Sequence, residues 1–352
     1  MKKNRRSGHW LFLLVCTAGM VLATLEGVAR LYYLFQGSST FVRLSKDPRL
    51  VFEPRPNQRF VNRFGQEVRV NALGLKGSEI EPRSQGEYRI LAIGDSIMAG
   101  EYLAEPKRLP GLVADEIHAL TGAQTKVWNG AVGGYNAWQE LGILKTKIRQ
   151  VDPDLVLVGV CANDFVPSRA HAFQLGSRVF ILSHRDGSMA RFFNSLYQRS
   201  DFYKLAYDSL HEIRLKQEVR KQGYEVYLKQ YVASPDSSQE KAWEGALEEI
   251  VHLAREDGAT PILIFFPLHS QVYRGDTAMN QTLFEWASEK GYPFIDLTGI
   301  FRKIDATGMS LFREGDFVHP NEKGLQIASK SVIERLKQEK LLQLAQKEPS
   351  GP

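Results

Sequence analysis

The chain contains the run Arg89-Ile90-Leu91-Ala92-Ile93-Gly94-Asp95-Ser96, in which an unbroken apolar stretch ends in a glycine, an acid and a serine. An apolar stretch of this length without polar alternation is typical of a strand buried on both faces of a parallel sheet. Polar residues that directly follow such a strand lie at the carboxyl edge of the sheet, where α/β proteins gather their ligand groups. The run therefore predicts an α/β fold with Ser96 at that edge.

Four further strand-like runs follow along the chain, at 126–128, 155–160, 260–266 and 294–297. Between them, apolar residues share one helical face over 112–120, 243–254 and 325–336. Strands that alternate with helices in this way form a parallel sheet covered on both faces. We expect about five parallel strands in an α/β domain that spans residues 87–345.

Two regions depart from this alternation. Residues 36–86 are rich in Gly, Ser, Pro, Asn and Arg, and they read as a linker and strap. Residues 165–240 combine a possible hairpin around 178–182 with long amphipathic helices, so we expect a helical insertion there. The insertion either caps a site at the sheet edge or is a solvated excursion, and the sequence does not decide between the two. Residues 346–352 form a tail.

The first 35 residues have the features of a membrane anchor. Four basic residues, Lys2, Lys3, Arg5 and Arg6, precede an uncharged apolar run that begins at Trp10. The apolar character continues to about residue 35, which is long enough to span a bilayer. Because the basic charges lie at the start, we expect the N-terminus inside and everything after residue 36 outside the cytoplasm. A cleavable secretory signal is the alternative, and it also exports the domain.

Charge and cysteine content exclude several classes of protein. The net charge of +5 falls to about +1 without the four basic residues at the N-terminus, so the body is nearly neutral and nucleic acid is not an expected partner. Two cysteines, Cys16 in the apolar run and Cys161 after a strand, offer no disulfide or metal framework. The histidines show no metal-ligand spacing, and we expect no cofactor.

Four segments bring polar groups to the predicted carboxyl edge, and each has a use in acyl transfer. Ser96 supplies a hydroxyl, which becomes a nucleophile when a base removes its proton. His319 is the candidate base, and Asp316, three residues earlier, can orient its ring. Gly134 and Asn163 can donate hydrogen bonds to the oxyanion of the tetrahedral intermediate. Each signal is weak alone, since Gly-Asp-Ser is usually a plain turn and Asn163 is also a natural helix cap.

Together the four segments resemble the SGNH (GDSL-type) hydrolases, in which four sequence blocks supply serine, glycine, asparagine and histidine. The matching segments are 94–96, 129–134, 162–164 and 316–319. The resemblance implies a three-layer, flavodoxin-like α/β/α fold, an esterase reaction, and an oxyanion hole formed by the Ser96 N–H, Gly134 and Asn163. Two positions depart from the family pattern, because Cys161 replaces a usual glycine and Ile97 replaces a frequent leucine. These departures bear on substrate subclass rather than on the catalytic groups.

Other residues near the edge have simpler interpretations. His269 follows the fourth strand and is a rival base or a substrate contact, while Tyr135 and Trp138 either line a pocket or pack against the next helix. Asp95 is expected to order the turn before Ser96. The leading hypothesis is an esterase that cleaves O-acyl groups of an envelope polysaccharide or lipid. An O-acyltransferase acting on a glycan and a non-catalytic glycan-binding or envelope assembly protein are the alternatives.

Overall fold

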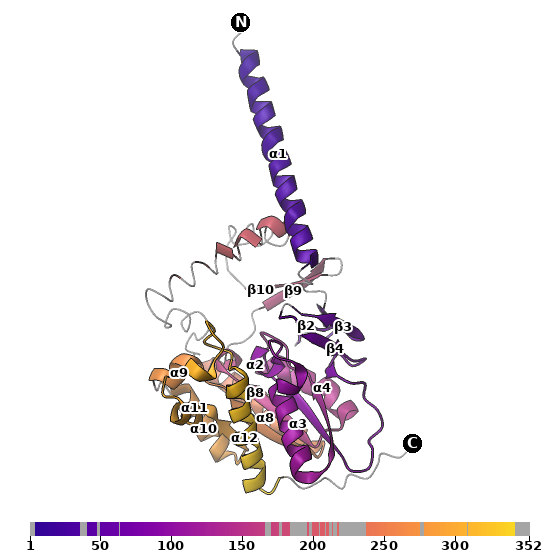
Figure 1. Cartoon of the computed structure of the whole chain (residues 1–352), viewed down its shortest axis with the longest axis vertical. Helices are drawn as coiled ribbons and strands as arrows, with labels where there is room; N and C mark the ends of the chain where they lie inside the picture. Colours follow the sequence, from indigo (N-terminus) through magenta and orange to yellow (C-terminus); the bar gives the residue numbers. More distant parts are fainter. Residues whose placement is uncertain are drawn as a thin grey trace.

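The computed structural model of the chain describes residues 4–35, 41–47, 50–62, 64–165, 170–175, 178–183, 237–274, 278–307 and 309–341, with isolated positions between 196 and 217. Within these residues, a long N-terminal helix stands clear of a single α/β domain (Figure 1). The helix leaves the domain on the side where the β9–β10 hairpin lies.

Helix α1 (Asn4–Phe35) covers the predicted anchor. Among the described residues it is the helix whose length and composition suit a membrane span, over Phe12–Leu31. Glu26 and Arg30 form an i, i+4 ion pair on this helix, at 3.0 Å. Near its domain end, Glu26 also accepts hydrogen bonds from the Ser200 hydroxyl at 2.8 Å and the Asp201 N–H at 3.1 Å. The insertion is therefore attached to α1 by a specific contact.

Eight strands form the central sheet, in the order β12-β11-β8-β6-β7-β5-β4-β3. The five predicted strands are confirmed, and neighbouring members pair in parallel. They are β6 (Glu87–Ile93), β7 (Gln124–Asn129), β8 (Leu155–Val160), β11 (Thr260–Phe265) and β12 (Phe294–Asp296). Strand β6 lies between β7 and β8 with every residue buried, so it is an interior strand of the parallel part.

The region 36–86 extends this sheet, which the sequence analysis did not predict. Strands β3 (Gln58–Val61), β4 (Glu67–Val70) and β5 (Lys76–Gly77) add to the edge of β7 in antiparallel pairing. A separate antiparallel pair, β1 (Val42–Leu44) and β2 (Phe52–Pro54), lies beside them. The strap is thus part of the sheet as well as a connection.

Helices cover both faces of the sheet, so the three-layer α/β/α fold is confirmed (Figure 1). Alternate residues of β6 point to opposite faces, as the strand geometry requires: Leu91 and Ile93 enter one core, and Ile90 and Ala92 the other. The first core is covered by α4 (Ala137–Val151), α8 (Ser237–Glu256) and α10 (Ala278–Glu289). The second is covered by α3 (Leu109–Thr121), α11 (Leu297–Ile304) and α12 (Glu322–Gln338).

Short elements complete the connections: α2 (Ser96–Ala99), α9 (His269–Arg274), and the 3₁₀ turns η1 (Glu105–Lys107), η2 (Ala162–Phe165) and η3 (Met309–Leu311). The insertion contains the predicted hairpin, formed by β9 (Ala170–Leu175) and β10 (Arg178–Ser183) in antiparallel register. Helical residues are described at isolated positions between 196 and 217. The rest of the predicted helical insertion, and the tail at 346–352, lie outside the described residues.

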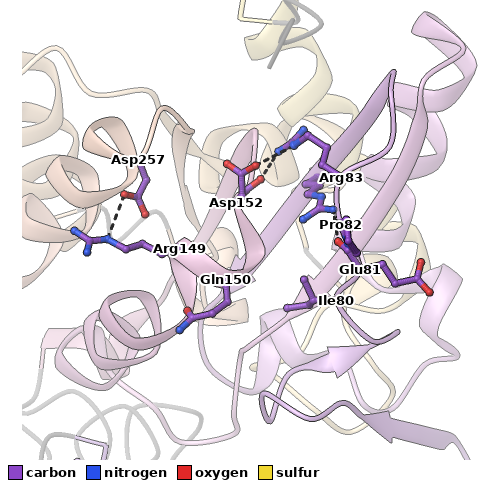
Figure 2. Close-up of a pocket in the computed structure, with 9 residues that line it drawn as sticks. Ile80, Glu81, Pro82, Arg83, Arg149, Gln150, Asp152 and Asp257 are labelled. Carbon is purple, nitrogen blue, oxygen red and sulfur yellow. Dashed lines mark hydrogen bonds and ion pairs between the residues drawn. The ribbon is translucent and has the colours of Figure 1, made fainter. Parts of the chain in front are cut away.

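A buried ion network fastens the strap at the amino edge of the sheet, beside a cavity of about 480 Å³ (Figure 2). The Arg83 guanidinium is 2.8 Å from the Asp154 carboxylate and 3.0 Å from that of Asp152, and it donates to the Glu87 carbonyl at 3.1 Å. Asp154 also accepts the Arg89 backbone N–H of β6 at 2.7 Å. Because Arg83 is 5% exposed, its charge depends on these partners for solvation.

We predict that Arg83→Met lowers the free energy of unfolding by about 3–5 kcal/mol, because it leaves the Asp154 carboxylate buried without its cation. The matched control is Arg149→Met, which removes an exposed guanidinium 3.9 Å from Asp257 (Figure 2) and should cost about 0–1 kcal/mol. Urea unfolding of the full chain in detergent measures both. Equal losses in the two variants would contradict a structural role for the buried network.

Candidate active site

The turn after β6 presents Ser96 at the carboxyl edge of the sheet. Gly94 has φ +153°, and a Cβ at this position would lie 2.6 Å from the Met98 Cβ, so the turn requires glycine. The Asp95 carboxylate accepts the Ile97 N–H at 2.8 Å and caps the short helix α2, which Ser96 begins. Asp95 thus orders the turn, as the sequence predicted.

The loop after β7 lies against this turn. The Val132 N–H donates to the Gly94 carbonyl at 3.1 Å, and the Asn129 side chain donates to the Met98 carbonyl at 2.9 Å. These bonds place Gly133 beside Ser96, so that a Cβ built on it would be 3.6 Å from the Ser96 Cβ. The next residue, Gly134, has φ +82°, a conformation that glycine adopts without strain.

The segment after β8 places the third block at the same edge. Cys161 directly follows the strand, is 4% exposed, and donates its thiol hydrogen to the Asp95 carboxylate at 3.1 Å. Its backbone N–H donates to the Asp164 carboxylate at 2.7 Å, which closes the η2 turn. The backbone of Asn163 belongs to η2, whereas its side chain lies outside the described part of the structure.

The last segment folds back on itself and presents an imidazole to Ser96. The carbonyl of Arg313 accepts the Asp316 N–H at 3.0 Å, and one Asp316 oxygen accepts the N–H groups of Val318 at 3.0 Å and His319 at 3.1 Å. The other Asp316 oxygen is 2.8 Å from His319 Nδ1. On the far side of the ring, Nε2 is 2.9 Å from the Ser96 hydroxyl. Residues 96 and 319 are therefore joined at the sheet edge.

The environment keeps Asp316 ionised. Burial raises the pKa of its carboxyl group, but the hydrogen bonds and charge of His319 and the Val318 and His319 N–H groups outweigh burial and lower the pKa to about 2. An ionised carboxylate on Nδ1 requires the proton to be on that nitrogen, so Nε2 is free to accept from Ser96. The geometry can thus abstract the proton of a serine hydroxyl.

Two backbone donors near the serine have no other partner. Among the described residues, the N–H groups of Ser96 and Gly134 donate to no other group. Because both segments flank the Ser96 hydroxyl, these N–H groups can donate hydrogen bonds to the oxyanion that forms when a carbonyl is attacked. Gly133, next to Gly134, is the closer of the two glycines to the Ser96 side chain, and the sequence alone could not distinguish their positions.

A cation and two aromatic rings lie around the Asp316 carboxylate, and sequence reasoning missed all three. One nitrogen of Arg313 lies 3.1 Å from the Asp316 oxygen that also contacts His319. Its guanidinium carbon is 4.7 Å from the centroid of the Tyr102 ring and 5.2 Å from that of Phe64. Phe64 comes from the strap, between β3 and β4. The strap therefore contributes to the surroundings of the site.

Tyr102 contacts the imidazole itself. Its ring meets that of His319 edge to face at 5.6 Å, and its hydroxyl donates to the Pro320 carbonyl at 2.7 Å. Burial raises the pKa of this phenol, so it remains a donor. The position of Tyr102, six residues after the nucleophile, carries no sequence signal that separates it from an ordinary loop aromatic.

The other candidates have structural roles. His269 stacks on Tyr273 with centroids 6.3 Å apart and packs edge to face on Phe312 at 5.6 Å, and its backbone N–H donates to the Phe317 carbonyl at 2.9 Å. Tyr135 is fully buried and donates its hydroxyl to the Phe52 carbonyl. Within the described residues, no group of three or more His, Cys, Asp or Glu side chains could hold a metal ion.

Comparisons with known proteins place the chain in a family. A family model described as the GDSL-like lipase/acylhydrolase family matches residues 92–327. A curated arylesterase of Vibrio mimicus is 35% identical over 81 residues, which are 23% of this chain and 40% of that relative, so the chain spans about two fifths of the relative's length.

Solved structures with a similar arrangement include two bacterial hydrolases. The psychrotrophic esterase EstA from Pseudoalteromonas sp. is 14% identical, with 71% of this chain and 97% of that chain covered at a TM-score of 0.40. A lipase/acylhydrolase from Enterococcus faecalis is 16% identical, with 72% and 96% covered at a TM-score of 0.41.

Proposed function

Because this chain belongs to the GDSL-like lipase/acylhydrolase family and is a hydrolase acting on ester bonds, we propose that Ser96, His319 and Asp316 perform its reaction. The observation that carries the proposal is the continuous contact from the Ser96 hydroxyl to His319 Nε2 at 2.9 Å and from Nδ1 to Asp316 at 2.8 Å. A binding module has no need for a hydroxyl in contact with a base of this kind.

In the first half of the reaction, His319 Nε2 takes the Ser96 proton as the hydroxyl oxygen attacks the ester carbonyl. The imidazolium that forms is stabilised by Asp316, whose low pKa keeps it ionised throughout. His319 then returns the proton to the departing alcohol, and the acyl group remains on Ser96. In the second half, His319 activates a water molecule that attacks the acyl-enzyme and releases the acid.

We assign the oxyanion hole to the backbone N–H groups of Ser96 and Gly134 and to the Asn163 side chain. The two N–H groups are unused by other described residues, and Asn163 follows Cys161 at the same edge. Removing one such donor typically costs about 10²–10³-fold in turnover. These donors act on the transition state, because the negative charge appears only when the carbonyl is attacked.

The proposed substrate is an O-acyl ester outside the cytoplasm, on an envelope polysaccharide or lipid. Helix α1 supports a membrane anchor through its apolar span at Phe12–Leu31. Figure 1 shows α2, which begins at Ser96, on the side of the domain that faces α1. An anchored domain in this orientation holds its catalytic edge toward the membrane surface, where acylated lipids and glycans of the envelope lie.

The central test replaces the two groups that exchange the proton. Ser96→Ala and His319→Ala should each lower the hydrolysis of p-nitrophenyl acetate by about 10⁴-fold or more, and the double variant should be little worse, because the two residues act as one unit. Fluorophosphonate should label the wild type and not Ser96→Ala. Ser288→Ala, at an exposed position of α10, is the control and should be unaffected. A folded Ser96→Ala protein with wild-type activity would reject the mechanism.

Product analysis separates the hydrolase from the acyltransferase. Given an ester donor and a saccharide acceptor, the enzyme should release mainly free acid, because the proposed acyl-enzyme is resolved by water. Acylated saccharide as the main product would instead identify a transferase that uses the same residues.

Arg313 provides a test of the charge balance around the imidazole. Its cation offsets part of the negative charge of Asp316, so Arg313→Gln should favour the imidazolium and move the acidic limb of the kcat/KM profile to higher pH. Arg313→Lys keeps the charge and should restore the wild-type limb, although it loses the planar contact with the Tyr102 and Phe64 rings. An unchanged limb in Arg313→Gln would show that this cation does not act on the catalytic pair.

The location is tested by a reporter enzyme fused after Pro352. Since the basic residues precede the apolar run, the reporter should be active only outside the cytoplasm. Reversal of the basic charges at residues 2–6 is the matched control and should reduce export. A reporter active in the cytoplasm would end the proposal of an extracytoplasmic enzyme.

A further inference from the structure

Three carboxyl groups lie together behind the Ser96 turn, and the proposed mechanism uses none of them. They belong to Asp95 before α2, Asp164 in η2 and Glu140 in the first turn of α4. Their exposed fractions are 5%, 1% and 0% respectively. Burial of ionised carboxylates is costly unless each is paired or neutralised, so the cluster requires a physical explanation.

Asp95 and Asp164 are satisfied by donors from the segments that they join. Asp95 accepts the Ile97 N–H at 2.8 Å and the Cys161 thiol at 3.1 Å. Asp164 accepts the Cys161 N–H at 2.7 Å and the N–H of Ala137, the first residue of α4. Cys161, which replaces the usual glycine of the family pattern, thus contacts both carboxylates.

Glu140 is different, because no described residue donates a hydrogen bond to either of its oxygens. Its carboxyl group contacts that of Asp164, and one Asp164 oxygen also lacks a donor. Two carboxyl groups can form a hydrogen bond only if one of them carries a proton.

Charge and burial both favour that proton. Burial raises the pKa of Glu140, and the negative charges of Asp164 and Asp95 raise it further. Burial and the charge of Asp95 also raise the pKa of Asp164, while the N–H groups of Cys161 and Ala137 and the hydrogen bond with Glu140 oppose this. Because Asp164 has these donors and Glu140 has none, the proton belongs on Glu140.

We infer that Glu140 is a positioning residue, a neutral acid that donates its O–H to Asp164 and so fixes the three segments that carry the oxyanion donors. Asp95 precedes Ser96, Asp164 follows Asn163, and Glu140 lies on the helix that begins three residues after Gly134. One proton therefore fixes the positions of all three segments relative to one another. The inference rests on the proposed oxyanion hole, and it adds a residue that touches neither substrate nor Ser96.

Because it depends on this proton, the arrangement of the three segments depends on pH. Folding raises the pKa of Glu140 above its unfolded value, so the folded chain keeps a proton in a pH range where the unfolded chain has lost it. Stability therefore falls as the pH rises through that range. At the alkaline end the pair loses its proton, the two carboxylates repel each other, and the oxyanion segments separate. The titratable groups that face Glu140 are Asp164 and Asp95, with the Cys161 thiol beside Asp95.

The test compares Glu140→Gln and Glu140→Leu in the full chain, with the exposed Glu334→Gln on α12 as the matched control. The glutamine amide can donate to Asp164 but cannot titrate. Glu140→Gln should keep most of the wild-type kcat at neutral pH and lack the alkaline limb, and its advantage in Tm over the wild type should grow with pH. Glu140→Leu should lose about 10²-fold in kcat with little change in KM, because the donors are misplaced.

Infrared spectroscopy gives a readout that does not depend on catalysis. The wild type at neutral pH should show the C=O band of a buried protonated carboxylic acid, which disappears in Glu140→Gln and persists in Glu334→Gln. Absence of a band that depends on Glu140 would overturn the inference, as would a Glu140→Gln protein as impaired as Glu140→Leu. If Glu140→Leu does not fold, the inference is still tested by the pH profile of Glu140→Gln and by the loss of the infrared band in that variant.

These outcomes are distinct from failure of the proposed function. A wild-type protein that is not labelled by fluorophosphonate would reject the role of Ser96. The infrared band and the dependence of Tm on pH would then still report whether Glu140 carries the proton. The positioning role would be rejected, because it depends on the proposed oxyanion hole.

Discussion

Parallel pairing of β6 with β7 and β8 determines where Ser96, Gly134 and Asn163 lie. Since the three strands point the same way, the residues that follow each of them reach one edge of the sheet. The turn at Gly94 then directs Ser96 toward the loop that follows β7. The return from Leu311 to Pro320, closed by a bridge between Phe312 and Pro320, brings His319 to the same point. Chemistry that needs residues 223 positions apart thus depends on strand direction more than on any local motif.

The strap shows how the edge of such a sheet can be made part of the site. An exposed edge at β7 would offer unpaired backbone groups to other chains, and β5 covers it. Lys76 on β5 is 3% exposed and contacts Glu101 at 3.1 Å, which joins the strap to the loop after α2. The hairpin of β3 and β4 then places Phe64 against Arg313. The region between α1 and the α/β domain therefore contributes to the surroundings of Asp316.

The sequence predicted those strands and contacts that depend on residues close to each other along the chain. The five parallel strands were predictable because each is a short apolar run with no competing periodicity. The contact of Asp316 with His319 was predictable because His319 lies only three positions later in a turn. The strands at 58–77 were not, because they are two to four residues long and take their pairing from β7 rather than from their own pattern. Arg313 and Glu140 look like surface charges in sequence, and only the fold shows that one is held between two rings and the other is fully buried.

Two environments near Ser96 shift the pKa values of carboxyl groups in opposite directions. This contrast explains why the two groups have different proposed roles. Asp316 receives two N–H groups and the imidazole of His319, and its pKa falls to about 2. Glu140 is enclosed among other carboxylates, and its pKa rises. A carboxyl group kept ionised can stabilise an imidazolium, and one kept neutral can act as a donor. The orienting role therefore suits the half-buried loop that carries Asp316. The neutral acid suits the fully buried position of Glu140 between α4 and η2, where a shared proton reduces the repulsion between the carboxylates.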